Sequence, residues 1–309
     1  MGSCRAPSWD LCCSLFLQMT CHSTCRTAGL YADDADDAQF LDTDTPQNFP
    51  ALKERIERNL SLALDWFTQN RLKINPSKTE FLLLKSRHSK TTTHFSIRFG
   101  KSEIIPVPSV KVLGVTVDSN LVWDRHVSHV IQRCFCVLIG LARIRRRMPR
   151  QTRQLLIEAL VFPHLQYCMA VWGGCGVTLQ KRLQKCINFG VRIVTDLSRR
   201  DRVTQHRKEL GWPSIGELIC ERDLNIMFRL LHGTNAPELI RRHITHRADV
   251  SSRSTRASDD GQLEVPRART EFARRSFLCR ASRAWNGLSS RVRSSPNLPV
   301  FRRRLCELR

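Results

Sequence analysis

Two pairs of adjacent aspartates, Asp33-Asp34 and Asp36-Asp37, stand in the sequence Leu-Tyr-Ala-Asp-Asp-Ala-Asp-Asp-Ala. Apolar or amphipathic residues on both sides predict a tight turn between short strands. Adjacent carboxylates repel each other, and binding divalent cations is one of the few ways to offset that repulsion. This segment therefore favours a metal site on a hairpin, and the surrounding chain has to fold so as to support it.

The charge of the chain is large and unevenly distributed. The formal net charge is +22 and the pI about 10.3, which favours a polyanionic partner, with nucleic acid first and an acidic membrane surface second. Residues 31–60 carry eight carboxylates against three Lys or Arg, whereas residues 241–309 carry seventeen Arg and six carboxylates. An acidic metal-binding patch followed by a basic remainder suits a nucleic-acid polymerase. The alternative is an ordinary acidic loop with a solvated Arg-rich tail.

The thirteen cysteines are odd in number and irregular in spacing, so they predict neither a disulfide framework nor a zinc finger. A reduced, intracellular compartment, cytoplasmic or nuclear, is therefore expected. The apolar run from Leu11 to Met19 is too short to span a bilayer and lacks the marks of a signal peptide. We expect no transmembrane helix and no membrane partner.

Local patterns predict an α+β fold. Leu52, Ile56, Leu60 and Phe67 lie on one face of a helix that begins after Pro50 and ends near Asn70. Segments 81–84, 95–99 and 110–117 have the length and apolar content of strands. From about residue 123 the pattern turns helical, with further helices expected at 151–172, 178–197 and 215–233, separated by Pro163, a Gly pair and Gly211-Trp212-Pro213. A final Arg- and Ser-rich segment from about residue 241 is expected to be loosely ordered outside 277–288.

An arginine cluster follows the helical pattern that ends near Leu141. Its members surround Met148-Pro149 and are Arg143, Arg145, Arg146, Arg147 and Arg150. Guanidinium groups this close repel one another unless phosphates or carboxylates lie nearby. The cluster is therefore a candidate surface for a nucleic-acid backbone, with a solvated basic turn as the alternative.

Several segments, in order along the chain, resemble the reverse transcriptase of non-LTR retrotransposons (LINE, jockey-like), from its catalytic Asp-Asp hairpin onward. Tyr31-Ala32-Asp33-Asp34 resembles the hairpin itself. The remaining segments are 66–80 (Trp-Phe-Thr-Gln-Asn-Arg-Leu-Lys-Ile-Asn-Pro-Ser-Lys-Thr-Glu), 113–118 (Leu-Gly-Val-Thr-Val-Asp), Val171-Trp172-Gly173, Gly211-Trp212-Pro213 and Ala284-Trp285-Asn286-Gly287-Leu288. Each match is weak alone, and their order makes the resemblance.

The resemblance implies RNA-directed DNA synthesis, in which two Mg²⁺ ions activate a primer hydroxyl and stabilise the leaving pyrophosphate. Asp33 and Asp34 would be the metal ligands, with Tyr31 and Ala32 beside the primer end. Lys78 would assist the leaving group, although a surface lysine is the alternative. Gly114 would allow close approach to the primer, or is a simple turn glycine. RNA template and DNA primer would be the partners, with no small-molecule cofactor.

The same resemblance implies an architecture and two departures from it. Residues 30–119 would form a partial palm, 120–240 a helical thumb-like domain and 241–309 a basic C-terminal extension, after an atypical, frame-shifted or disordered N-terminus at 1–29. The Ala-Asp-Asp unit is duplicated, so Asp36 and Asp37 are an alternative metal pair, because a three-residue insertion turns side chains to the other face of a strand. Asp10 is the one carboxylate before Tyr31, and the fingers and the earlier palm aspartate are not recognised. We therefore expect a truncated reverse transcriptase that does not polymerise alone, or else a non-catalytic basic nucleic-acid-binding protein derived from a retroelement.

Overall fold

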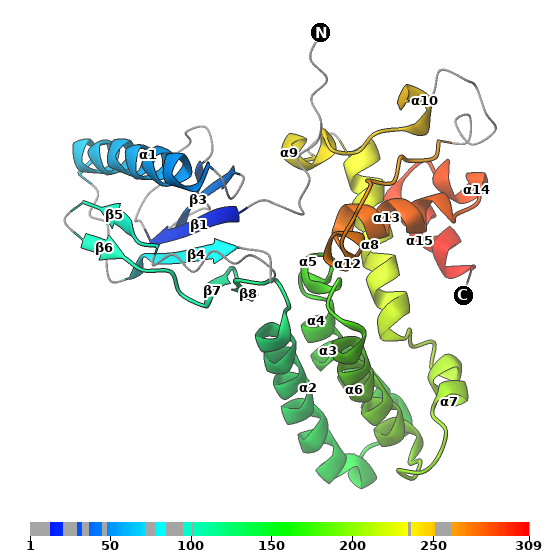
Figure 1. Ribbon diagram of the computed structural model, residues 1–309. Helices are drawn as coiled ribbons and strands as arrows, with labels where there is room; N and C mark the ends of the chain where they lie inside the picture. Colours follow the sequence, from blue (N-terminus) through cyan, green and yellow to red (C-terminus); the bar gives the residue numbers. More distant parts are fainter. Residues whose placement is uncertain are drawn as a thin grey trace. The chain divides into compact units, whose positions relative to one another are not determined.

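The computed structural model describes residues 13–20, 30–32, 37–44, 48–71, 78–84, 95–100, 102–233, 236–250 and 261–308. The chain divides into two compact units, Met1–His126 and Val127–Arg309 (Figure 1).

The first unit contains a four-stranded antiparallel sheet. Its strands are β1 (Cys13–Thr20), β2 (Leu30–Ala32), β3 (Asp37–Asp44) and β4 (Glu80–Leu84), in the order β2-β3-β1-β4. β3 pairs with β1 along its whole length, from Asp37 opposite Thr20 to Asp44 opposite Cys13. β2 pairs with β3 from Leu30 opposite Phe40 to Ala32 opposite Ala38, so the two strands form the arms of a hairpin.

Helix α1 (Phe49–Gln69) follows the sheet strand β3 and confirms the helix predicted after Pro50. Its apolar stripe is buried, with Leu52, Ile56 and Leu60 each at most 5% exposed. This stripe packs in one core with Phe81 of β4 and with Ile97. Pro near the first turn suits a helix start because proline has no N–H to leave unbonded there. The four-residue period of the sequence therefore predicted this helix and its buried face correctly.

Two small hairpins complete the first unit. β5 (Ile97–Phe99) pairs with β6 (Ser102–Ile104), and β7 (Ser109–Val112) pairs with β8 (Val115–Asp118). The second hairpin turns at two residues with positive φ, Leu113 at 45° and Gly114 at 83°. A two-residue loop with positive φ at both positions matches the right-handed twist of its strands, and glycine adopts it without strain. The segment 110–117, expected to form strand structure, thus contains two strands joined by this turn.

The second unit is helical. Its longer helices are α2 (Asp124–Ile144), which begins just before the unit boundary, α3 (Arg150–Leu160), α6 (Val177–Thr195), α8 (Ile215–His232), α13 (Phe277–Asn286) and α15 (Leu298–Cys306). Shorter helices are α4 (Phe162–Gln166), α5 (Met169–Trp172), α7 (Thr204–Glu209), α9 (Glu238–Arg241), α10 (Arg247–Val250), α12 (Glu271–Arg274) and α14 (Ser290–Arg293). The cysteines whose side chains the structure describes are free thiols.

The stretch expected to be helical at 151–172, with a break at Pro163, forms three helices, α3, α4 and α5. Pro163 lies in the first turn of α4, where its missing N–H is tolerated, and Cys168 takes a left-handed conformation before α5 with φ of 48°. The other two expected helices are found as α6 and α8. Pro163 therefore starts a new helix and ends the previous one, as the pair Gly173-Gly174 does after α5.

The Arg-rich C-terminal segment is more ordered than its composition indicates. Leu263, Trp285 and Phe301 are buried against Leu224 and Phe228 of α8 in one apolar core. The ring centroids of Phe228 and Phe301 are 4.6 Å apart. The described part of residues 241–309 therefore contributes buried apolar side chains to the core of the second unit. A few large apolar residues, separated by many arginines, are enough to fix it.

One helical stretch among the described residues, Asp124–Arg147, is long and apolar enough by length and composition to cross a membrane. Core helices meet the same test. Val127, Cys134 and Leu138 on this stretch are fully buried, and the rings of Phe135 and Phe189 of α6 lie 5.9 Å apart. The absence of a membrane span, expected from the sequence, stays a prediction.

Candidate nucleic-acid interface

A sharp reversal of the chain presents the predicted arginine cluster. α2 ends at Ile144, a single 3-10 turn spans Arg145–Arg147, and α3 starts at Arg150. Met148 and Pro149 between them are extended, with ψ of 138° and 153°. A residue before proline avoids the helical conformation, so the two helices cannot fuse. The cluster consequently lies at a turn between two helices, where long side chains can reach solvent.

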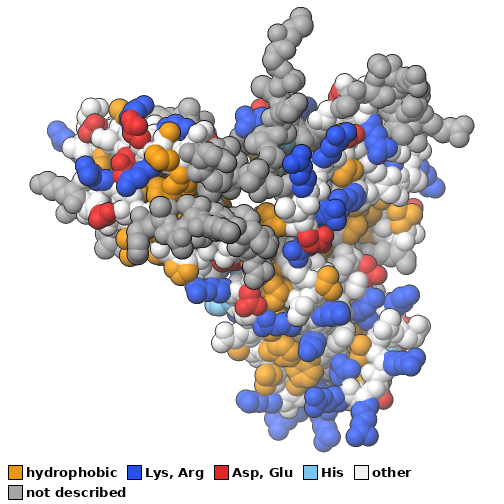
Figure 2. Space-filling view, viewed as in Figure 1, with side chains coloured by type: hydrophobic (Ala, Val, Ile, Leu, Met, Phe, Trp, Pro, Cys, Tyr) orange, Lys and Arg blue, Asp and Glu red, His pale blue; other side chains and the backbone are white. Residues whose placement is uncertain are grey.

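Four arginines of the cluster, Arg143, Arg146, Arg147 and Arg150, are exposed. No ion pair with a carboxylate forms at any of them within the described part of the chain. Figure 2 shows Lys and Arg side chains gathered at the end of the second unit where α2 and α6 end. An uncompensated group of this kind attracts anions, and phosphate suits arginine because its planar fork donates several hydrogen bonds.

Arg145, the fifth arginine of the cluster, forms an ion pair with the residue that ends α6. Asp196 terminates α6 in a left-handed conformation with φ of 55°. Its carboxylate lies 3.6 Å from Arg145 Nε and accepts hydrogen bonds of 2.8 and 2.9 Å from Arg153 Nη1. Arg153 also donates to the carbonyl of Ile193, at 2.6 Å. These contacts hold the arginine turn against the end of α6.

A second group of arginines follows α6 and was not among the predicted site residues. Arg199, Arg200 and Arg202 are exposed in the loop that leads to α7. Arg192 fixes this loop, because its guanidinium donates to the carbonyls of Ser198, Arg199 and Asp201 at 3.2 to 3.4 Å. Since Asp196 joins the start of the loop to the 145–147 turn, the two groups lie at the same end of the unit. We call the exposed arginines 143, 146, 147, 150, 199, 200 and 202 the basic tip.

The predicted metal residues lie at the hairpin of the first unit, largely outside the described residues. Asp33, Asp34 and Asp36 are outside them, and Asp37 is described only by its backbone, as the first residue of β3. Tyr31 and Ala32 lie on β2, opposite Gln39 and Ala38. The strands on either side of the Asp pairs are thus paired as a hairpin requires.

The strand beside this hairpin carries no carboxylate. β1 has the sequence Cys-Ser-Leu-Phe-Leu-Gln-Met-Thr, and its last residue, Thr20, pairs with Asp37. Its first residue, Cys13, pairs with Asp44, seven residues along β3, which at ~3.3 Å per residue is roughly 23 Å away. Asp10, the carboxylate considered from the sequence, precedes that far end of β1 and lies outside the described residues. β1 therefore supplies no third carboxylate at the Asp pairs.

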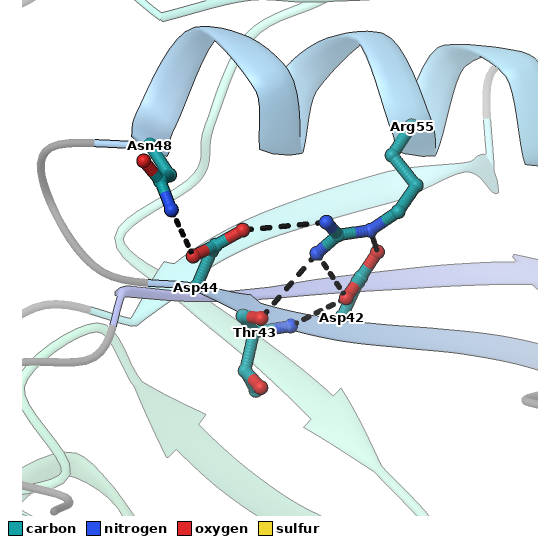
Figure 3. A network of polar contacts seen from close by, with 5 residues as sticks. All are labelled: Asp42, Thr43, Asp44, Asn48 and Arg55. Carbon is teal, nitrogen blue, oxygen red and sulfur yellow. Dashed lines mark hydrogen bonds and ion pairs between the residues drawn. The ribbon is translucent and has the colours of Figure 1, made fainter. Parts of the chain in front are cut away.

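Two further aspartates of the acidic segment are paired with one arginine (Figure 3). Arg55 of α1 donates from Nε and Nη2 to the Asp42 carboxylate at 2.6 and 2.8 Å, and its Nη1 lies 3.3 Å from Asp44 Oδ2. The hydrogen bond to Asp42 is the main cause that raises the pKa of Arg55, so the guanidinium of Arg55 stays protonated. Asn48 donates to Asp44 at 3.2 Å. This part of the acidic segment binds α1 to β3 and leaves fewer oxygens for a metal ion.

No group of three or more His, Cys, Asp or Glu side chains placed to hold a metal ion exists among the described residues. The described donors therefore do not form a Mg²⁺ site, and a site at the Asp pairs remains a prediction. Lys78 is exposed just before β4, and Gly114 is the turn residue of the β7–β8 hairpin. Within the described part of the chain, no hydrogen bond or ion pair joins Lys78 to another predicted site residue.

The two units differ sharply in charge. Residues 1–126 hold 15 Lys and Arg and 14 Asp and Glu, whereas residues 127–309 hold 35 and 14, so the net charges are +1 and +21. Nearly all of the basic excess belongs to the unit that carries the basic tip.

Two proteins of Drosophila melanogaster match this chain. The 115 kDa protein in type-1 retrotransposable element R1DM is 27% identical over 192 residues, which is 60% of this chain and 18% of that protein. The probable RNA-directed DNA polymerase from transposon BS is 26% identical over 207 residues, 65% of this chain and 22% of that protein. The chain is distantly similar to retrotransposon reverse transcriptase proteins. It spans about a fifth of the length of the curated relatives that it matches.

No protein-family model matches the chain, and no solved structure matches it. The similarity to retrotransposon proteins agrees with the resemblance found in the motifs, at the level of a retroelement-derived RNA-directed DNA polymerase family.

Proposed function

We propose that this chain is the part of a non-LTR retrotransposon reverse transcriptase that begins at the catalytic hairpin, and that its helical unit binds the nucleic-acid backbone through the basic tip. The observation that carries the proposal is the gathering of seven exposed arginines, from two separate segments, at one end of a unit with net charge +21. Palm-like and thumb-like roles for the two units are part of the same proposal.

The chemistry of the basic tip favours phosphate over base edges. Arg143 belongs to the last turn of α2, Arg147 ends the 3-10 turn that follows, and Arg200 lies in a loop, so the tip offers no single helix face to insert into a groove. Contacts to phosphate position a nucleic acid without reading its sequence. We therefore expect binding that depends steeply on salt and little on sequence.

The test measures binding of a fluorescein-labelled single-stranded RNA of mixed sequence across a range of salt concentrations. In the R143Q/R146Q/R147Q/R150Q variant, we expect the plot of log affinity against log salt to become shallower. Its slope should lose about 3 in magnitude, since each phosphate contact on a single strand contributes ~0.7. Affinity at low salt should fall about tenfold or more.

The matched control changes four other exposed arginines, as R241Q/R242Q/R267Q/R269Q. The change of net charge is the same, so an equal loss in both variants would show that binding follows overall charge, and the basic tip would have no particular role. Wild-type protein that binds RNA without salt dependence would exclude the proposal altogether.

Polymerase chemistry is the second candidate function, favoured by the antiparallel pairing of β2 and β3 on either side of the Asp pairs. By resemblance, Mg²⁺ would be held by Asp33 and Asp34, or by Asp36 and Asp37. Because β1 offers no carboxylate opposite Asp37, we expect no Mg²⁺-dependent primer extension by the 309-residue chain alone. Extension that is lost in D33N/D34N and kept in D36N/D37N would establish the chemistry and its register.

A further inference from the structure

A pocket lies behind the basic tip, between the 145–147 turn and the end of α6. It is lined by Arg145, Arg146, Met148, Arg153 and Asp196. Three of these five residues are arginines, and one is a carboxylate. The Asp196 side chain is 55% exposed, whereas the Arg153 side chain is 9% exposed. The pocket thus combines a buried cation with a half-exposed anion.

The buried arginine is incompletely satisfied. Arg153 donates through Nη1 to both oxygens of Asp196 and to the carbonyl of Ile193. Its Nε is buried and has no hydrogen-bond partner among the described residues. A buried donor without a partner is costly, and a guanidinium can serve an anion with more oxygen atoms than a carboxylate has. Phosphate has the geometry for this, and Arg146 in the same pocket has no carboxylate partner in the described part of the chain.

We propose that this pocket binds one backbone phosphate of a nucleic acid, and that Asp196 is a resident carboxylate which the phosphate displaces. The proposal rests on nucleic-acid binding by the basic tip and specifies one site within it. Asp196 ends α6 in a left-handed conformation, so its side chain belongs to a helix end and can swing outward without unwinding the helix. In the free protein it holds Arg145 and Arg153 in place; in the complex it moves to solvent.

Exchange of one anion for another has a thermodynamic signature. When an unpaired arginine binds a phosphate, the nucleic acid releases a condensed cation. When the phosphate displaces Asp196, the freed carboxylate adds a negative charge beside the nucleic acid and keeps a cation near it, so the net release at this site is close to zero. Removal of the carboxylate should therefore raise the affinity and also steepen the salt dependence.

The test compares D196N with wild-type protein, using the labelled single-stranded RNA and the same range of salt. Asparagine adopts the left-handed conformation readily, and its amide oxygen can still accept from Arg153. We expect D196N to bind about fivefold more tightly at low salt, which is the upper range for an ion pair near the surface. We also expect its salt slope to be steeper by about 0.7.

The matched control is D201N, which removes the same charge from the neighbouring loop. Asp201 accepts a hydrogen bond from the backbone N–H of Ser198 at 2.7 Å and forms no ion pair with an arginine among the described residues. We expect D201N to change affinity by about twofold or less, because an exposed charge acts weakly through salt solution, and to leave the slope unchanged. Equal effects of D196N and D201N would overturn the proposal, and so would weaker binding by D196N.

Two further arms keep the test decisive. Thermal unfolding of each variant checks the fold, and D196G, with the residue best suited to the left-handed conformation, replaces D196N if the latter is unstable. Tighter binding of D196N to phosphatidylserine vesicles with unchanged RNA binding would overturn a nucleic-acid site in favour of a lipid headgroup. If the wild-type protein shows no salt-dependent RNA binding, both proposals are overturned. If the wild type binds but D196N shows no gain in affinity, only the phosphate pocket is overturned and binding by the basic tip stands.

Discussion

Several arginine side chains of this protein are bound within its own fold and are not offered to a ligand. Arg280 of α13 is an example: its Nε and Nη2 contact the Asp223 carboxylate at 2.9 and 3.0 Å, and it also donates to the carbonyls of Ala170 and Arg275. Asp223 is 1% exposed. This pair connects α8, α13 and the short helix α5. The arginines of the basic tip differ because nothing in the described structure neutralises them.

The buried pair leads to a prediction for single residues. Burial raises the pKa of the Asp223 carboxyl, and the hydrogen bond and charge of Arg280 oppose that rise. Removing one partner of a buried pair leaves the other charge buried without a partner. We therefore expect Asp223→Ala to cost about 3 to 5 kcal/mol in the free energy of unfolding, measured in urea. Glu271→Ala, which breaks exposed contacts to Arg274 and Arg275, should cost about 0.5 kcal/mol or less. A cost below about 1 kcal/mol for Asp223→Ala would contradict the assignment.

At the scale of elements, periodicity predicted the helices that stand alone and failed where local chemistry intervenes. α1, α6 and α8 follow from their apolar stripes, which are long and uninterrupted. The motif Gly211-Trp212-Pro213 was visible as a break, but its packing was not. Trp212 is 4% exposed, donates from Nε1 to Glu158 at 2.7 Å, and packs its ring against Gly190, where an added Cβ would lie only 3.2 Å from the ring. Such a contact depends on how three helices meet, which no local pattern encodes.

The helix after this motif has a charged N-terminus whose effect on stability can be measured. Ser214 and Glu217 form a reciprocal capping box at the start of α8, and Arg207 Nη1 lies 3.0 Å from the Glu217 carboxylate. Burial opposes ionisation of Glu217, but the hydrogen bonds from Ser214 and the charge of Arg207 outweigh it and lower its pKa. The stabilisation is therefore present above the unfolded-state pKa, near 4.5, and is lost as the pH falls through the lower folded-state value.

We expect Ser214→Ala to cost about 1 kcal/mol in the free energy of unfolding at neutral pH. Glu217→Gln keeps the cap hydrogen bonds and removes the charge, so it should cost about 0.5 kcal/mol at neutral pH and nothing at acidic pH. Unfolding in urea at several pH values measures both. Glu54→Gln, which affects an exposed pair with Arg58, is the control. A cost of Glu217→Gln that stays constant with pH would exclude the ionic contribution.

At the scale of the whole molecule, the sequence predicted half of the candidate interface. The cluster at 143–150 is visible as a run of arginines, whereas the group at 199–202 became part of the site through Asp196, which is about fifty residues from Arg145 along the chain. Only the packing of α2 beside α6 brings them together. The uneven distribution of charge was visible in the sequence, but the position of the unit boundary, which assigns +1 to one unit and +21 to the other, was not.

The separation of charge between the units leads to a prediction about the whole chain. If the second unit carries the binding surface, a protein consisting of residues 120–309, which retains all of α2, should bind single-stranded RNA within about twofold of the full chain and with the same salt slope. The first unit, with net charge +1, should add little at long range because salt screens exposed charges beyond ~10 Å. Fluorescence anisotropy measures both affinities, and circular dichroism checks that the shorter chain keeps its helices. A loss of tenfold or more in a folded 120–309 chain would mean that the first unit contacts RNA directly, and the hairpin with its two Asp pairs would then become the first place to look for that contact.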